Sequence, residues 1–307
     1  MGRRGPSRGV DRLHGVLVVD KPAGPTSAAV VALVRRALGA ASVGHTGTLD
    51  PMATGVLPLV LGEATKLAGH LLADDKEYEG ELELGFQTDT LDLEGQVLHR
   101  APVEAVREVT RAAVEAGLVT LTGELLQRPP LFSALHHEGR RLHEIARAGE
   151  TVTPALRPVR VDRFTLLSFD SPRARFVVAC GKGTYVRSLV RDLGERLGVG
   201  ATLVALRRTR AGRFSLADAI SLDEVALLAQ ARLVTPSDAV GQLPQVLLTA
   251  ADLVHVQHGR QLFAPPGLTP GEAVRLVTEQ GTLAARAEER AGRLAYLRVM
   301  TYAEPTP

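Results

Sequence analysis

The loop over residues 44–51 is the part of this sequence whose residue types and spacing could do chemistry. It consists of Gly-His-Thr-Gly-Thr-Leu-Asp-Pro, and its carboxylate, Asp50, could act as a nucleophile or as a base. An Asp before a Pro more often only shapes a turn. Here, however, the glycines allow a ligand to approach the backbone, and loops held by a rigid scaffold often carry function. We therefore take Asp50 as the candidate catalytic residue.

The segments next to this loop predict the elements that position it. Residues 14–19 predict a strand, and residues 27–38 predict a helix, because their apolar residues recur at helical spacing. Ser27 could cap this helix, and Gly39 would end it. The apolar run over residues 56–61 predicts a buried strand. The loop is therefore expected to connect a helix with a strand.

Residues 78–86 alternate between two faces, as expected of a half-buried strand. Tyr78 begins the inward row, and the outward row is acidic, with Glu79, Glu81 and Glu83. Further along the chain we expect a helix, an inserted arm, a strand and another helix, over residues 102–116, 125–150, 176–180 and 186–197. The alternation places the Tyr78 side chain on the buried face of its strand.

The end of the chain has a different pattern. A short helix is predicted over residues 250–258, followed by three short strands over 273–278, 282–288 and 293–300. Such a meander is typical of a small sheet or barrel. Residues 1–12 carry four arginines and almost nothing to bury, so we expect a flexible basic tail. We therefore divide the chain into this tail, a domain over residues 13–243 and a module over residues 244–307.

The composition excludes several classes of protein. The 307 residues are 45% hydrophobic and 23% charged, which is typical of a globular protein. A single cysteine, Cys180, permits no intrachain disulfide and fits a reducing compartment. No apolar run approaches the roughly 20 residues that a membrane helix requires. We therefore expect a soluble, cytoplasmic protein with no membrane partner.

The net charge of +2 conceals two opposite local charges. Residues 173–213 contain ten basic and two acidic residues, a balance of +8, whereas residues 74–94 have a balance of −8. A basic surface of this size could neutralise phosphates and bind nucleic acid. Such a run could equally be a solvated helix face.

Several cofactor and metal motifs are absent from the sequence. Neither the phosphate-binding loop nor the dinucleotide-binding fingerprint occurs, and His136, His137 and His143 lack zinc-protease spacing. We interpret these three as surface histidines. The sequence therefore predicts neither a cofactor nor a metal.

A set of motifs in chain order is similar to those of one family. These are Lys21-Pro22, 44–57 (GHTGTLDPMATGVL), 62–67 (GEATKL), 76–78 (KEY), 85–92 (GFQTDTLD), 129–135 (PPLFSAL) and 181–187 (GKGTYVR). Together they resemble the TruB-type pseudouridine synthases, and more narrowly the bacterial members that modify uridine 55 in the TΨC loop of tRNA. Two arm positions, His136 and His143, depart from the family pattern. They lie outside the catalytic motifs, so they affect the expected grip on RNA rather than the reaction.

The resemblance implies a cofactor-free isomerisation in which Asp50 is the nucleophile. The carboxylate would attack the uracil ring or the ribose anomeric carbon, or would steer a glycal intermediate, and the sequence does not choose among these. Arg187 would pair with Asp50, and Tyr78 would stack on a uracil that has flipped out of the RNA. As alternatives, Arg187 could be a helix-surface cation and Tyr78 a core residue.

The resemblance also implies residues that bind the substrate. His45 would occupy the space left by the flipped base, and Tyr185 and Leu206 would line the uridine pocket. Lys21, Pro22 and Lys66 match motif positions, although a surface lysine is the ordinary alternative. His45 could also be a turn residue, and Tyr185 and Leu206 could be packing residues.

For the whole chain, the resemblance implies an α/β catalytic domain with a mixed, largely antiparallel sheet, an arm that grips RNA, and a small C-terminal PUA-like β domain. The implied partner is the TΨC arm of tRNA, with no obligatory protein partner and a monomeric state. Two alternatives are an RNA-binding or tRNA-folding protein without catalysis, and a guide-dependent relative that acts on ribosomal RNA. Activity on bare tRNA would separate both from the first interpretation.

Overall fold

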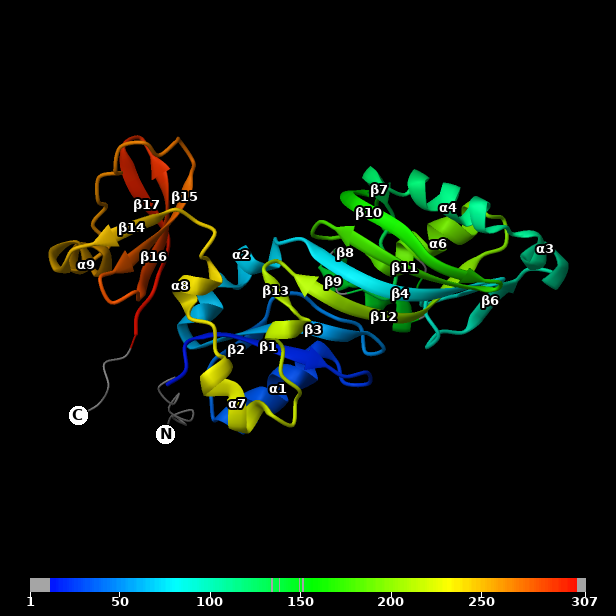
Figure 1. The fold of residues 1–307 in the computed structure, drawn as a ribbon, viewed down its shortest axis with the longest axis horizontal. Helices are drawn as coiled ribbons and strands as arrows, with labels where there is room; N and C mark the ends of the chain where they lie inside the picture. Colours follow the sequence, from blue (N-terminus) through cyan, green and yellow to red (C-terminus); the bar gives the residue numbers. More distant parts are fainter. Residues whose placement is uncertain (1–11, 134, 138, 149, 151, 303–307) are drawn as a thin grey trace.

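A mixed, mainly antiparallel sheet forms the centre of the larger part of the molecule (Figure 1). The computed structural model describes residues 12–133, 135–137, 139–148, 150 and 152–302. Within them the main strand order is β1-β3-β12-β4-β11-β10-β7, with β2 beside β3 and β13 beside β12. The strands are β1 (Gly15–Lys21), β2 (Val43–His45), β3 (Thr54–Leu61), β4 (Lys76–Leu84), β7 (Gly123–Gln127), β10 (Arg157–Asp170), β11 (Arg173–Cys180), β12 (Ala201–Ala211) and β13 (Phe214–Ser215). The predicted fold class is confirmed, and nearly all of the predicted basic tail lies outside the described residues.

The parallel pair β3 and β12 is the exception in this sheet, and it brings β12 next to the loop that contains Asp50. Gly55 of β3 lies opposite Arg208 of β12. It has a φ of +100°, and a Cβ there would lie 2.2 Å from the carbonyl oxygen of Arg208. Glycine is therefore required at position 55, because any side chain would collide with the β12 backbone.

Helices cover the apolar face of the sheet and close its core (Figure 1). Those that contribute to this core are α1 (Ser27–Leu38), α3 (Val103–Glu108), α4 (Arg111–Thr120), α6 (Val186–Arg196) and α7 (Val225–Arg232). The other helices are α2 (Ala68–Leu72), α5 (Leu142–Arg147) and α8 (Pro236–Ala239), with 3-10 turns at Gly62–Leu67 and Leu216–Asp218. Two small hairpins complete this part, β5 (Phe86–Thr88) with β6 (Val97–Arg100), and β8 (His136–His137) with β9 (Arg140–Arg141).

Two sequence predictions about helices are wrong in detail. Thr26, and not Ser27, caps α1, because its side chain accepts the Ala29 N–H while the Ser27 hydroxyl binds elsewhere. The single helix expected over residues 102–116 is two helices, because Val109 is extended and Thr110 caps the second one. A residue that can cap a helix inside an apolar pattern allows the chain to turn there.

The C-terminal segment forms a separate four-stranded sheet that packs on the larger part. Its elements are β14 (Gln245–Leu248), α9 (Ala250–Gln257), β15 (Ala273–Thr278), β16 (Leu283–Arg290) and β17 (Arg293–Val299). The predicted meander is present, and β14, which pairs in parallel with β15, was not expected. Val277, Leu283 and Met300 share one apolar cluster with Val16 and Val60 of the central sheet. The exact domain boundaries stay a prediction.

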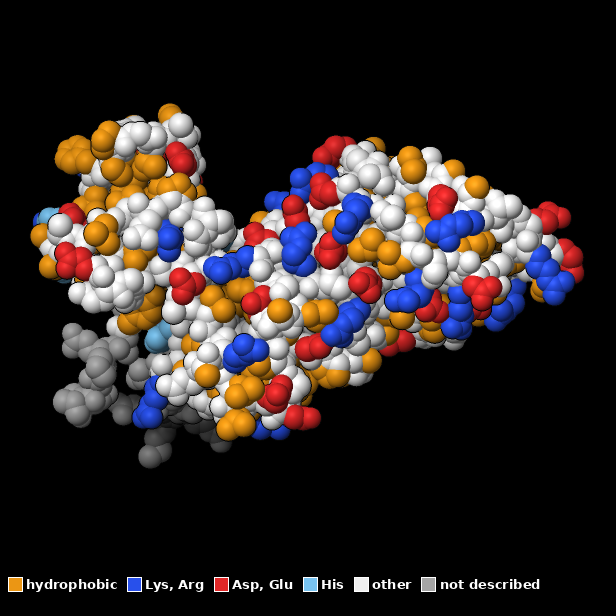
Figure 2. All heavy atoms as spheres, in the orientation of Figure 1, with side chains coloured by type: hydrophobic (Ala, Val, Ile, Leu, Met, Phe, Trp, Pro, Cys, Tyr) orange, Lys and Arg blue, Asp and Glu red, His pale blue; other side chains and the backbone are white. Residues whose placement is uncertain are grey.

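The acidic and basic stretches of the sequence meet across neighbouring strands. Arg173 of β11 contacts Glu81 and Glu83 of β4, and Arg163 of β10 contacts Glu77. Figure 2 shows acidic and basic side chains interspersed over the part of the surface formed by these strands. The outward row of acids predicted on β4 is therefore largely paired with arginines.

The +8 balance of residues 173–213 consequently overstates the free positive charge. Three of its arginines, Arg173, Arg187 and Arg207, form ion pairs with acids outside the stretch. Arg191 pairs with Asp192, which the balance already counts. Neutralisation of phosphates by this stretch must depend on its other cations.

Candidate active site

The loop that contains Asp50 is held by two buried side chains from the elements before it. Lys21, which is 0% exposed, donates to the carbonyls of Pro22, Pro51 and Ala53 at 2.7–3.0 Å. The Ser27 hydroxyl both donates to the Leu49 carbonyl and accepts its N–H. These bonds fix the backbone on both sides of residue 50, so the carboxylate is carried by a rigid loop.

Asp50 and Arg187 form a two-point ion pair. Arg187 Nη2 lies 2.9 Å from Asp50 Oδ1, and Nε lies 2.9 Å from Oδ2. The guanidinium also donates to the carbonyls of Thr90 (2.8 Å) and Phe132 (3.0 Å). Arg187 is 5% exposed, whereas the Asp50 side chain keeps 33% of its surface. The arginine is therefore fixed by several partners, and the carboxylate still faces open space.

A second carboxylate, Asp92, lies on the other side of Arg187. Its Oδ2 is 3.5 Å from Arg187 Nη1, and its Oδ1 accepts from Thr90 Oγ1 and the Glu94 N–H. Asp92 is 3% exposed. The sequence motif over residues 85–92 includes this residue, but no role was predicted for it. The sequence signal that could have identified it is a Thr two positions before an Asp, a pair that can form a local hydrogen bond.

The pKa of Asp50 reflects opposing effects. Burial raises the pKa of this carboxyl above its ordinary value, and the negative charge of Asp92 adds to the rise. Arg187 opposes both through its charge and its hydrogen bond. The arginine thus favours the ionised carboxylate in surroundings that would otherwise favour the protonated acid.

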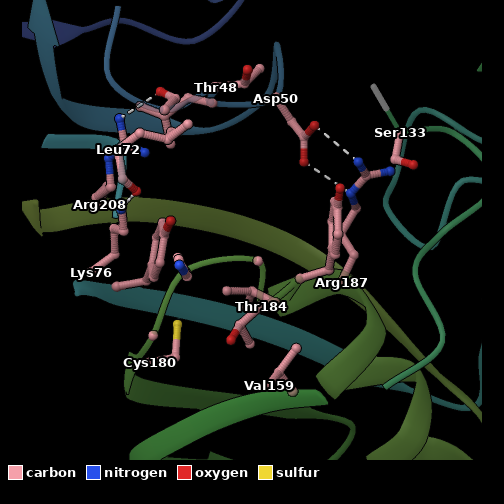
Figure 3. A pocket seen from close by; sticks show the side chains of 18 of the residues that line it. Thr48, Asp50, Leu72, Lys76, Ser133, Val159, Cys180, Thr184, Arg187 and Arg208 are labelled. Atoms are coloured by element: carbon pink, nitrogen blue, oxygen red, sulfur yellow. Dashed lines mark hydrogen bonds and ion pairs between the residues drawn. The ribbon is translucent and has the colours of Figure 1, made fainter. Parts of the chain in front are cut away.

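Asp50 and Arg187, labelled in Figure 3, line a pocket of about 820 Å³. Tyr78, Tyr185 and Leu206 also line it. The structure therefore brings five of the nine predicted site residues together. Burial raises the pKa of both tyrosines, so their hydroxyls are protonated at neutral pH. The pocket combines one ionisable carboxylate with aromatic and aliphatic walls, which suits a flat, uncharged ring beside a reactive group.

Two more buried cations, Lys76 and Arg208, line the same pocket at the side away from Arg187 (Figure 3). Arg208 lies directly opposite Tyr78 in the register of β12 and β4. Burial lowers the pKa of Lys76, and the positive charge of Arg208 lowers it further. Cys180 also lines the pocket, but burial raises its pKa to about 11, so its thiol is a poor nucleophile.

The other four predicted site residues are absent from the described lining of this pocket. Lys21 lies beneath the loop, as described above, and the neighbouring Pro22 is exposed. Lys66 pairs with Glu63 and donates to the Val299 carbonyl at 2.9 Å, which joins the 3-10 turn over Gly62–Leu67 to β17 of the C-terminal sheet. The His45 ring accepts the Gly47 N–H within the loop. Substrate contact by these residues stays a prediction.

Two kinds of feature are missing from the described part of the chain. There, three or more His, Cys, Asp or Glu side chains nowhere gather as they would around a metal ion. None of the helices described is long and apolar enough to span a membrane.

The sequence of this chain is similar to those of one protein family. Residues 35–186 match the N-terminal domain model of the TruB family pseudouridylate synthases, and residues 187–253 match a C-terminal domain model of tRNA pseudouridylate synthase B. The tRNA pseudouridine synthase B of Aromatoleum aromaticum is 49% identical over 83% of this chain and 83% of its own length. That of Thermobifida fusca is 46% identical over 91% of this chain and 95% of its own.

A solved structure agrees with these sequence matches. An archaeal box H/ACA sRNP Nop10–Cbf5 complex contains a chain with a TM-score of 0.70 and 26% identity, over 98% of this chain and 89% of that one. The match therefore extends over nearly the whole chain. The chain belongs to the TruB family of pseudouridine synthases.

Proposed function

We propose that this protein converts uridine 55 in the TΨC loop of tRNA to pseudouridine, with Asp50 as the nucleophile. The observation that carries the proposal is the Asp50 carboxylate, held by Arg187 at the wall of a pocket that Tyr78 also lines. The names of the relatives, tRNA pseudouridine synthase B, support tRNA as the substrate.

The reaction is an isomerisation and needs no external reactant. The bond between uracil N1 and ribose C1′ breaks, the ring rotates, and a bond forms between C5 and C1′, while the proton leaves C5 and N1 gains one. Asp50 would assist the cleavage by attack on the uracil ring or on C1′, or by steering a glycal intermediate. Arg187 keeps the carboxylate ionised and oriented when RNA excludes water from the pocket.

The target uridine must leave its loop before it can reach Asp50. Base flipping costs unstacking energy, which contacts with the flipped base offset. In the proposed complex the uracil stacks on Tyr78 between Tyr185 and Leu206. The His45 side chain would enter the vacated space, and the C-terminal PUA-like sheet would bind another part of the tRNA. The proposal includes monomeric action in the cytoplasm, and light scattering of the purified protein tests the first of these.

The experiment uses unmodified tRNA transcript and maps pseudouridine by nucleotide position. We expect product at position 55 without any guide RNA, and none from a transcript with cytidine at that position. Asp50→Asn should bind tRNA with a Kd close to that of the wild type and form no product. The exposed carboxylate in Asp223→Asn provides the matched control, with unchanged rate.

The possible results separate the candidate functions. Normal product from Asp50→Asn would contradict the assignment of the nucleophile. Binding of tRNA by the wild type without product would favour an RNA-binding protein. Product only after addition of a guide RNA would favour the guide-dependent relative.

A further inference from the structure

The pocket wall contains two buried cations, Lys76 and Arg208, that have no carboxylate partner within 4 Å among the described residues. Two further lining cations without an ion pair there, Arg157 and Lys182, are exposed. Arg208 is 1% exposed and donates to the carbonyls of Val56 (2.6 Å) and Gly47 (3.2 Å). Lys76 is also buried and donates to the carbonyls of Leu72 (2.7 Å) and Asp74. Backbone carbonyls are neutral, so these bonds leave both positive charges in the pocket wall without a direct counterion.

The two side chains reach the same region of the pocket. A Cβ placed on Gly47 would lie 3.5 Å from Arg208 Nη1 and 3.9 Å from Lys76 Cε. Gly47 has a φ of +135°, a conformation that favours glycine, so no side chain fills this position. Gly47, Lys76 and Arg208 all line the pocket, so the two cations border space that a ligand can occupy.

The opposite side of the pocket differs in its charge balance (Figure 3). There, among the described residues, Arg187 alone forms direct ion pairs with Asp50 and Asp92, so one guanidinium faces two carboxylates. An anionic ligand group would be repelled by Asp50 and attracted by Lys76 and Arg208. The distribution of charge thus orients any ligand that has one neutral and one anionic part.

The register of the sheet places the two cations next to the proposed base platform. Lys76 precedes Tyr78 by two residues on β4, so both side chains project from the same face. Arg208 is the cross-strand neighbour of Tyr78. A nucleotide whose uracil stacks on Tyr78 would therefore have its backbone near both cations.

We propose that Lys76 and Arg208 form a phosphate subsite, which binds a backbone phosphate on one side of the flipped uridine. The proposal rests on the proposed function, because it assigns a further part of the same RNA substrate to the same pocket. Arginine and lysine bind phosphate oxygens by charge-assisted hydrogen bonds, and these strengthen where water is excluded. The bound phosphate would fix the ribose, so that C1′ and the uracil lie at Asp50.

The test neutralises the phosphate and the lysine separately and together. Hairpin RNAs that reproduce the TΨC arm carry one uncharged methylphosphonate linkage, either 5′ or 3′ of the target uridine or in the stem. Single-turnover pseudouridine formation and Kd are measured for the wild type and for Lys76→Met. We expect one flanking substitution to lower the rate constant at subsaturating enzyme about tenfold, because one charged hydrogen bond is lost. Lys76→Met should lower it by a similar factor on the unmodified hairpin.

The assay that combines Lys76→Met with the methylphosphonate hairpin tests whether the lysine and the phosphate contact each other. If Lys76 binds that phosphate, Lys76→Met and the neutral linkage together should cost little more than either change alone, because both remove the same interaction. Lys76→Arg should restore most of the rate on the unmodified hairpin. Losses that multiply to about 100-fold would overturn the proposal, because the two groups would then act independently.

The rate could also fall because of a general loss of positive charge or because the variant unfolds, and the protein could lack the proposed activity altogether. One control addresses each of these three alternatives. Arg111→Met removes an exposed cation of α4 and should respond to each linkage as the wild type does. If Lys76→Met unfolds, as thermal denaturation would show, the wild type still tests the proposal, because flanking linkages no more harmful than the stem linkage would overturn it. Absence of product from the unmodified hairpin would instead contradict the proposed function itself.

Discussion

The arginines of this chain occur in two contrasting settings, the exposed face of the central sheet and the wall of the pocket. On the sheet face, Arg163 and Arg173 are 54% and 58% exposed and pair with glutamates of β4. In the pocket, Arg187 and Arg208 are 5% and 1% exposed. All four side chains carry the same charge, but the surroundings of that charge differ.

Burial, rather than the number of pairs, decides which of these arginines matter. An exposed ion pair is solvated and contributes about 0–1 kcal/mol. Removal of one partner from a buried pair leaves an uncompensated charge and costs about 3–5 kcal/mol. We therefore expect activity and folding to depend more on the buried arginines of the pocket than on the more numerous ion pairs of the sheet face.

The largest effect is expected from Arg187→Met. The change removes the two-point contact with Asp50, so the carboxylate loses both its orientation and the cation that favours its ionised form. The rate of pseudouridine formation in a single turnover should fall at least about 100-fold. Arg196→Met, which changes an exposed arginine at the end of the same helix, should retain the wild-type rate. A decrease of less than tenfold in the single-turnover rate of Arg187→Met would show that the reaction does not depend on the buried Asp50–Arg187 pair.

Arg208→Met should reduce the stability of the fold. Two carbonyls, those of Val56 and Gly47, lose their donor in the interior, and each unsatisfied acceptor costs about 1–3 kcal/mol. We expect a decrease of about 2 kcal/mol in the free energy of unfolding, measured by urea denaturation. The partly exposed neighbour Arg210 provides the control, Arg210→Met, with a smaller decrease. Equal free energies of unfolding for the two variants would contradict the expectation that buried Arg208 stabilises the fold more than partly exposed Arg210.

The rate should depend on pH through Asp50. Its pKa is raised by burial, and the protonated acid is not a nucleophile, so the rate should fall on acidification with a midpoint above the ordinary value of about 3.9. Asp92 contributes to the rise, so Asp92→Asn should move the midpoint to lower pH. Single-turnover rates at a series of pH values, with binding saturated, measure both midpoints. A midpoint that moves upward in Asp92→Asn would contradict the assignment of the titrating group.

The smallest effect is expected from Arg173→Ala on the sheet face. Its contacts with Glu81 and Glu83 are exposed, so the free energy of unfolding should change by less than about 1 kcal/mol. The Kd for tRNA should also change little, because these acids already neutralise the arginine. A decrease in tRNA affinity of more than about fivefold would show that this face contacts phosphates.

Local patterns in the sequence predicted many of the elements correctly. The alternation over residues 78–86 placed Tyr78 on the inward face, because strand residues alternate whatever their neighbours are. Where two local choices were equally good, the prediction was wrong. Thr26 and Ser27 can both cap a helix, and the structure uses Thr26 because the Ser27 hydroxyl holds the Leu49 backbone.

The sequence by itself determined the family, the candidate nucleophile, and the residue types that accompany it, because motifs of consecutive residues specify local chemistry. Only the tertiary structure decided which charges meet. Asp92 reaches Arg187, and Arg208 reaches Tyr78, through strand register and chain crossings that join residues far apart in the sequence. Burial likewise results from the packing of the whole chain. Removal of a buried charge in the pocket is therefore expected to cost more free energy than removal of a solvated charge on the sheet face.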